Sequence, residues 1–223
     1  MTNLQNDFET RLNNAAASLK VDLSGKQREQ ILRYINQLQR WNKTYNLTAV
    51  RDPEQMLIQH VFDSLSVVSP IDELVSAKKT NDVKIMDVGS GGGLPGVILA
   101  IAKPDWDITC VDAVEKKMAF VRQMSAVLEL PNLHATHQRV ETIPPYQADI
   151  VISRAFASLV DFVSLASRHV GVDGLMLAMK GREPDDEVAD LAKLGGWEVE
   201  QIKPLFVPEL DAQRCLVYLS QQG

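Results

Sequence analysis

The sequence predicts an α/β protein in which helices cover both faces of a mostly parallel sheet. From about residue 80 onward, apolar strand-like runs alternate with helical patterns, as they do in parallel sheets. The first run leads into a turn with four glycines within residues 89–93. Only residues 204–212 separate the last two runs, which is too short for a helical crossover. We therefore expect the last strand to pair antiparallel.

The composition is that of a globular protein with a sizeable core. The chain has 223 residues, 45% of them apolar, but no apolar run long enough to cross a membrane. Its polar, acidic beginning argues against a secretory signal, so we expect a cytoplasmic protein. Cys110 and Cys215 lie inside apolar runs and are expected to be reduced core thiols. No Cys/His cluster has metal-site spacing, and no metal is expected.

Residues 1–79 are predicted to form a helical extension packed on a second unit, residues 80–223. The apolar residues of 3–20 share one helix face. Although the net charge is −6, basic residues outnumber acidic ones between Lys20 and Arg51. This surplus indicates either a surface for nucleic acid or simply solvated helix faces.

Two further helices are predicted before residue 80. Ser24 to Gln27 has the capping-box pattern S-x-x-Q and predicts a helix whose apolar stripe ends at Trp41. Residues 42–50 break the period and are predicted to form a loop. Asp52-Pro53 predicts the next helix start, and this helix is expected to end near Pro70.

The second unit is predicted to contain seven strands and four helices. The strands are expected at 83–88, 107–112, 133–137, 148–153, 174–180, 197–203 and 213–220. The helices are expected at 96–103, 114–130, 158–169 and 184–194.

The glycine-rich turn, which we call the glycine loop, spans Gly89 to Gly96. Glycine permits positive φ and leaves no Cβ in the way of a ligand. The helix that follows has unpaired N–H groups at its start. Together they predict a nucleotide-like ligand at the carboxyl end of the first strand.

Three ligands compete for this loop. A triphosphate loop requires Gly-Lys-Ser/Thr, but Leu94-Pro95 stands there instead. A dinucleotide is possible, because Gly91 to Gly96 matches G-x-G-x-x-G and Asp112 ends the next strand, where it could bind ribose. This alternative corresponds to a nicotinamide-dependent oxidoreductase.

The third candidate is S-adenosyl-L-methionine, whose sulfonium and ammonium groups are cationic. Asp87 precedes the glycines and completes D-x-G-x-G-x-G with Gly89, Gly91 and Gly93, so a carboxylate is available for a positive ligand. Asp112 would again bind the ribose. Alternatively, Asp87 is a buried residue that accepts hydrogen bonds from backbone N–H groups. The antiparallel last strand also suits a methyltransferase sheet.

Five segments of the chain form a recognisable set: Trp41–Thr48, His60–Leu65, Asp87–Gly96, Ser153–Ser158 and Lys180-Gly181. The pairing of WNKTYNLT with SRAFAS in this order is highly specific. Through these segments, nearly the whole chain resembles the bacterial small-subunit ribosomal RNA guanine-N7 methyltransferases, once called glucose-inhibited division protein B.

The resemblance implies a class I methyltransferase fold, S-adenosyl-L-methionine as cofactor, and a guanosine in the decoding region of 16S rRNA as acceptor. By motif, the cofactor contacts would fall on Gly89, Leu94, Val140, Glu141 and Arg154. We expect Arg154 to lie nearest the transfer site, unless it is a structural arginine paired with a carboxylate.

Guanine N7 has an in-plane lone pair and needs no general base, so we assign none; orientation can supply most of the rate. The candidate RNA-binding residues are Lys43, Asn46, Arg154, Lys180 and Arg182. Phe156 or Tyr45 could stack on an extruded purine, but each is also a candidate for core packing. His60 and Asp63 share a helix face and are expected to form a structural pair that holds the NKTYNLT loop.

An acidic protein should bind naked RNA weakly, so we expect the assembled small subunit as substrate. No sequence feature indicates an oligomer, and a monomer is the default expectation. A catalytically silent RNA-binding or assembly protein that keeps the cofactor pocket remains a third hypothesis, besides the oxidoreductase.

Overall fold

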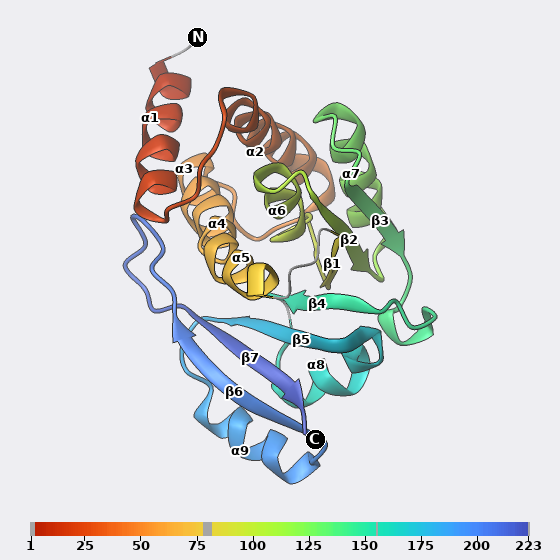
Figure 1. Ribbon diagram of the computed structural model, residues 1–223. Helices are drawn as coiled ribbons and strands as arrows, with labels where there is room; N and C mark the ends of the chain where they lie inside the picture. Colours follow the sequence, from red (N-terminus) through yellow and green to blue (C-terminus); the bar gives the residue numbers. More distant parts are fainter. Residues whose placement is uncertain (1–2, 78–81, 155, 223) are drawn as a thin grey trace.

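The computed structural model describes residues 3–77, 82–154 and 156–222, and its strands form one seven-stranded sheet (Figure 1). The order is β3-β2-β1-β4-β5-β7-β6. The strands are β1 (Val83–Val88), β2 (Trp106–Asp112), β3 (Leu133–His137), β4 (Ala148–Ser153), β5 (Val170–Lys180), β6 (Trp197–Pro204) and β7 (Cys215–Gln221). All seven predicted strands are present.

The sheet is parallel except for β7, which runs antiparallel to both β5 and β6. This confirms the predicted mixed sheet with an antiparallel last strand. β1 pairs with both β2 and β4, so the strand order reverses between β1 and β4. The carboxyl ends of these two strands therefore border the crevice in which open α/β sheets bind ligands.

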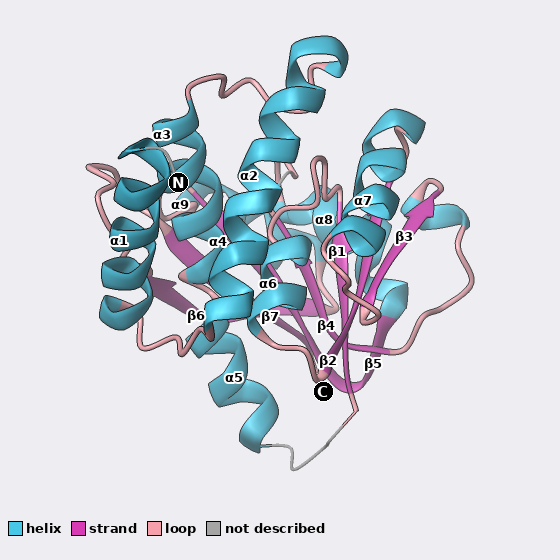
Figure 2. Cartoon of the chain, turned by 90° about the horizontal axis from the view of Figure 1, so that it is seen from above, coloured by secondary structure: helices cyan, strands magenta, loops and turns pink. Residues whose placement is uncertain are grey.

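Helices cover both faces of the sheet, as Figures 1 and 2 show. Alternate side chains along the strands point to two separate apolar cores. The first core is covered by α6 (Gly96–Ala102), α7 (Glu115–Val127) and the N-terminal helices. The second is covered by α8 (Leu159–Ala166), with the 3₁₀ turn η3 (Ser167–His169), and by α9 (Asp185–Leu194).

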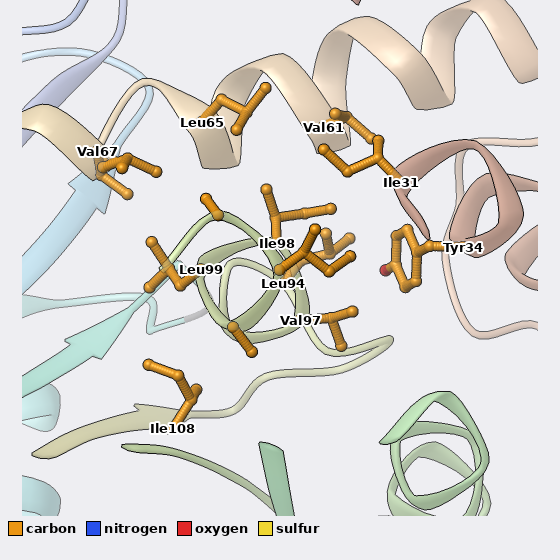
Figure 3. Close-up of a cluster of buried hydrophobic side chains, with 14 of the residues drawn as sticks. Ile31, Tyr34, Val61, Leu65, Val67, Leu94, Val97, Ile98, Leu99 and Ile108 are labelled. Atoms are coloured by element: carbon orange, nitrogen blue, oxygen red, sulfur yellow. The ribbon is translucent and has the colours of Figure 1, made fainter. Parts of the chain in front are cut away.

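The N-terminal helices share the first core with the sheet. They are α1 (Asn3–Ser18), α2 (Gly25–Tyr45), α3 (Pro53–Met56), the π-helical turn η1 (Leu57–Phe62), α4 (Asp63–Leu65) and α5 (Val68–Ala77). Figure 3 shows Ile31 and Tyr34 of α2, and Val61 and Leu65 from η1 and α4, around Ile98 of α6. The expected division at residues 79 and 80 lies outside the described residues, and it stays a proposal.

Two predicted boundaries in this part were wrong. α2 continues through residues 42–45, which we expected to be loop, and it is capped by Asn46 in a left-handed conformation. The side chain of Asn42 explains the difference: it is buried, accepts from Thr48 N–H at 2.9 Å and donates to the Val50 carbonyl at 3.1 Å. A polar residue therefore takes a core position in the last turn.

The helix predicted to end near Pro70 instead ends at Leu65, and α5 begins at Val68 after a turn. Pro70 falls in the first turn of α5, where its missing N–H group costs no hydrogen bond. Proline here follows a helix start rather than marking a helix end.

Candidate functional site

The glycine loop leaves β1 at the switch point, and three of its glycines have left-handed φ: Gly89 (70°), Gly91 (58°) and Gly93 (85°). A Cβ at Gly93 would lie 2.4 Å from Val97 Cγ2, which is far inside van der Waals contact. A Cβ at Gly96 would lie 2.4 Å from the Cys110 sulfur. The loop therefore requires glycine both for its conformation and for close packing.

Asp87 is fully buried beneath the loop and holds its far end. Its Oδ2 accepts a 2.8 Å hydrogen bond from Gly96 N–H, at the start of α6. Its Oδ1 is buried with no hydrogen-bond partner among the described residues. Burial raises the pKa of Asp87 to about 7. One oxygen thus has the backbone role that we considered as an alternative, and the other is left without a partner beneath the loop.

Asp112, at the end of β2, holds the near end of the loop. Its Oδ2 accepts from Gly91 N–H at 3.1 Å and from the Lys117 ammonium at 3.2 Å, while Oδ1 accepts from Val114 N–H at 2.9 Å. The two predicted acidic residues therefore shape the loop from both sides. Neither carboxylate lines the cavity that the loop borders.

The cavity beside the glycine loop has a volume of about 230 Å³ and is partly walled by N-terminal elements. It is lined by Leu38, Leu47, Thr48, Gly89–Gly92, Leu94, Lys117 and Arg154. Tyr34 of α2 directs its hydroxyl toward the loop, as Figure 3 shows, and donates to the Gly92 carbonyl at 2.8 Å. The N-terminal helices thus form part of the site. We call this space the glycine-loop cavity.

Arg154, directly after β4, lines the glycine-loop cavity and also a second cavity of about 320 Å³. Its Nη1 donates to the Gln59 carbonyl at 3.0 Å and to Asp63 Oδ2 at 3.2 Å. The other oxygen of Asp63 accepts from Arg214 Nε at 3.2 Å. Arg154 is therefore paired with a carboxylate, as our alternative predicted, and it also borders both cavities.

The second cavity, which we call the arginine cavity, lies between the ends of β4, β5 and β7. Its lining residues are Gln59, His60, Asp63, Arg154, Met179, Lys180, Gly181, Leu205, Arg214 and Cys215. Arg214 was not among our predicted site residues, because a single arginine before a strand gives no signal in the sequence. Asp63 was expected to pair with His60 rather than with two arginines.

His60 and Cys215 are not reactive groups in this cavity. Burial and the nearby charge of Arg154 lower the pKa of His60 to about 4, so the imidazole is neutral. Its Nε2 bonds the Thr48 hydroxyl at 2.8 Å and holds the NKTYNLT loop, as predicted. Cys215 is buried at the start of β7, as expected of a core thiol, and burial raises the pKa of its thiol.

Val140 and Glu141 lie in the 3₁₀ turn η2 (Val140–Thr142), away from the lining of both cavities. Their carbonyls accept from His169 Nε2 at 2.8 Å and from Arg168 Nη1 at 3.0 Å, respectively. The described contacts therefore fix this turn to the segment before β5. A cofactor role for the two residues stays a prediction.

The predicted RNA-binding residues fall into two groups. Lys43 and Asn46 lie at the end of α2, beside Leu47 and Thr48 of the glycine-loop cavity, and both are exposed. Lys180 ends β5 and Arg182 lies two residues beyond it, but Lys180 is only 12% exposed and pairs with Glu187 at 2.7 Å. Arg182 is therefore the freer cation of the second group.

The two aromatic candidates also separate. The ring of Phe156 packs on Phe162, with centroids 5.1 Å apart, against the second core. Tyr45 is 43% exposed and packs on Trp41, with centroids 5.0 Å apart. Of these two candidates, Tyr45 is the more exposed, and it lies two residues before Leu47 of the glycine-loop cavity.

Similar solved structures share this fold. A SAM-dependent methyltransferase from Aquifex aeolicus aligns with a TM-score of 0.53 at 16% identity, covering 78% of this chain and 96% of its own. A ribosomal protein L11 methylase from Lactobacillus delbrueckii has a TM-score of 0.53 at 10% identity, covering 77% and 80%. With the sheet order and the glycine loop at the switch point, they define a class I methyltransferase fold.

The family follows from the sequence comparisons. Residues 27–217 match the family model described as rRNA small subunit methyltransferase G (GidB). The chain is 60% identical over 210 residues to ribosomal RNA small subunit methyltransferase G of Bordetella pertussis, covering 94% of this chain and 91% of that protein. The protein of the same name from Methylibium petroleiphilum is 44% identical, covering 95% and 94%. This chain belongs to the rRNA small subunit methyltransferase G family, which excludes the oxidoreductase alternative.

Proposed function

We propose that this protein transfers the methyl group of S-adenosyl-L-methionine to N7 of a guanosine in the decoding region of 16S ribosomal RNA. Arg154 carries this proposal, because it lines both the glycine-loop cavity and the arginine cavity. A donor in the first cavity and an acceptor base in the second would then meet at this side chain. The family and the resemblance support ribosomal RNA as the acceptor.

The residues at the glycine loop fit the proposed cofactor. The unpartnered, buried Oδ1 of Asp87 suits a ligand that carries positive charge, and the loop offers backbone without Cβ atoms. When bound, S-adenosyl-L-methionine supplies an electrophilic methyl group on a sulfonium. The residues that we expect to hold it are Asp87, Gly89, Gly91, Gly93, Leu94, Asp112, Val140, Glu141 and Arg154.

The side chains of the arginine cavity favour a ring nitrogen as acceptor. N7 attacks through its lone pair without losing a proton, so the protein has only to orient the base. The one carboxylate among the lining residues, Asp63, is bonded to two arginines, and His60 is neutral and bonded to Thr48. Asp63 holds the two arginines in place and His60 holds Thr48, so neither side chain is placed to remove a proton from a bound base.

For the partner we propose the assembled small subunit rather than naked rRNA, with Lys43, Asn46, Lys180 and Arg182 as RNA contacts. A net charge of −6 opposes general binding to RNA, whereas a structured particle can present a local surface. We further propose that the enzyme acts as a monomer in the cytoplasm. Within the described residues, no helix is both long and apolar enough to cross a membrane.

The proposal is tested by methylation of small subunits from cells that lack this activity. The protein and labelled cofactor should place label on N7 of one guanosine, detected by strand cleavage at N7-methylguanosine, and naked 16S rRNA should react more slowly. Gly89→Val, which forces a branched side chain into a left-handed φ of 70°, should abolish transfer. Label on another atom, or equal labelling with Gly89→Val, would overturn the assignment. No label with the unaltered protein would favour the silent assembly protein.

A further inference from the structure

Two arginines that are far apart in the sequence contact one buried carboxylate in the arginine cavity. Asp63 is 4% exposed, and each of its oxygens accepts from one arginine at 3.2 Å: Oδ2 from Arg154 and Oδ1 from Arg214. Arg154 follows β4, and Arg214 directly precedes β7. The carboxylate therefore sets the separation of two guanidinium groups that the backbone alone would not bring together.

Each guanidinium keeps donors beyond those already bonded. A guanidinium carries five N–H groups. Arg154 uses Nη1 for Gln59 and Asp63, and Arg214 uses Nε for Asp63 and Nη1 for the Gln213 carbonyl. Both side chains are about one quarter exposed and line the cavity. The cavity thus presents N–H donors whose positions are set by Asp63.

Fixed donors distinguish purines by the group at position 6. Guanine has a carbonyl oxygen there, which accepts hydrogen bonds, whereas adenine has an amino group, which donates. N7 must keep its lone pair free for the methyl group, so O6 is the acceptor that remains on that edge of guanine. A cavity of about 320 Å³ lies in the size range of small-molecule sites.

We propose that Asp63 is a positioning residue that holds Arg154 and Arg214 so that their remaining N–H groups bind O6 of the acceptor guanine. Asp63 does not touch the base and acts only through the two arginines. This proposal rests on the function proposed above. It adds a reason for guanine over adenine and a residue on which that selectivity depends.

The test uses small subunits reconstituted with guanosine, inosine or 2-aminopurine at the methylated position. Inosine keeps N7 and O6, whereas 2-aminopurine keeps N7 but lacks O6. We expect unaltered protein to methylate inosine within about threefold of guanosine, and 2-aminopurine about 10- to 100-fold more slowly in kcat/KM. Asp63→Asn should lower kcat/KM for guanosine and inosine while leaving that for 2-aminopurine nearly unchanged. Asp63→Glu, which keeps the charge, should restore part of the selectivity.

A matched control separates selectivity from stability. Glu209→Gln removes another carboxylate bonded to an arginine, Arg11 at 2.6 Å, in the loop between β6 and β7, and it should leave the base ratios unchanged. If Asp63→Asn does not fold, Arg214→Gln replaces it as the test variant and is expected to change the base ratios in the same way. Arg214 is more exposed than Asp63, so its substitution should disturb folding less.

Two outcomes would overturn the inference. Equal fold losses in kcat/KM for all three bases with Asp63→Asn would mean that the arginines hold a group that the three substrates share, such as phosphate. Unchanged kcat/KM for all three bases would mean that Asp63 positions nothing that the reaction requires. Absence of N7 methylation by the unaltered protein would instead remove the proposed function itself.

Discussion

The hydroxyl of Tyr34 in α2 donates a 2.8 Å hydrogen bond to the carbonyl of Gly92 in the glycine loop. Tyr34 is fully buried, and burial raises its pKa, so the hydroxyl stays protonated and remains a donor. This bond links the N-terminal helices directly to the ligand loop. The helices are thus structurally coupled to the loop rather than only covering the sheet.

Tyr34→Phe should weaken both folding and cofactor binding. Loss of the donor leaves a buried carbonyl without a partner, which costs about 1–3 kcal/mol. We expect a lower free energy of unfolding in urea and a higher Kd for S-adenosylhomocysteine in calorimetry. Tyr146→Phe is the matched control, because it also removes a tyrosine hydroxyl bond, 2.9 Å to Thr109, away from both cavities. It should lower stability only; an equal change in Kd would contradict the coupling.

Gly93→Ala should destabilise the protein more than Gly91→Ala. Both positions have left-handed φ, for which a Cβ costs about 1–2 kcal/mol. A Cβ at Gly91 meets nothing within 4 Å, whereas at Gly93 it would lie 2.4 Å from Val97 and 3.1 Å from Val121. Overpacking adds about 1–3 kcal/mol at Gly93 alone. Urea unfolding of the two variants measures the difference. Equal losses in the free energy of unfolding would show that the loop shifts enough to accommodate the added Cβ at Gly93.

Asp87→Asn should change how stability depends on pH. The aspartate pKa is ~3.9 in an unfolded chain and about 7 in the folded protein. Between these values the folded state binds more protons, so the free energy of unfolding falls as pH rises from about 4 to about 7. Asparagine cannot ionise and still offers an acceptor to Gly96 N–H. As pH rises through this range, the free energy of unfolding of the variant should therefore increase relative to that of the unaltered protein.

Urea unfolding without cofactor, at several pH values from 4.5 to 8, measures this change. The comparison is made between the two proteins at each pH, so titration of other groups cancels. Parallel curves for the two proteins would show that Asp87 does not titrate in this range in the folded state.

The sequence predicted the strands of the sheet because each is a short apolar run bounded by turn residues, and the glycine loop because its residue types have few alternatives. The end of α2 was predicted wrongly because Asn42 is polar, yet its side chain replaces backbone partners for Thr48 and Val50. Periodicity counts such a residue as outside the core.

The arginine cavity could not be predicted from local pattern. Asp63 meets Arg154 across 91 residues and Arg214 across 151 residues, and it takes both the strand order β4-β5-β7 and the position of α4 to bring them together. The motif that contains Asp63 was recognisable as part of the resemblance. Its partners became apparent only with the fold.

Lys43→Gln should weaken binding of the small subunit and reduce its salt dependence. Lys43 is exposed in the last turn of α2, close in sequence to Leu47 and Thr48 of the glycine-loop cavity. A lysine that contacts one phosphate contributes roughly 0.7–0.9 to the slope of log affinity against log salt. The slope, measured from KM for small subunits at several salt concentrations, should fall by about that amount, with little change in kcat at saturation.

Lys26→Gln is the control for Lys43→Gln, because Lys26 lies in the first turn of the same helix, exposed and paired with Glu129 at 3.2 Å. The neighbouring Gln27 donates to the Ile101 carbonyl near the end of α6, which places this turn at the opposite end of the sheet from the glycine loop. Both variants remove one positive charge, so a general effect of net charge would shift the two slopes alike. A reduced slope for Lys43→Gln alone would place RNA at the carboxyl edge of the sheet, whereas equal shifts would argue against a contact at Lys43.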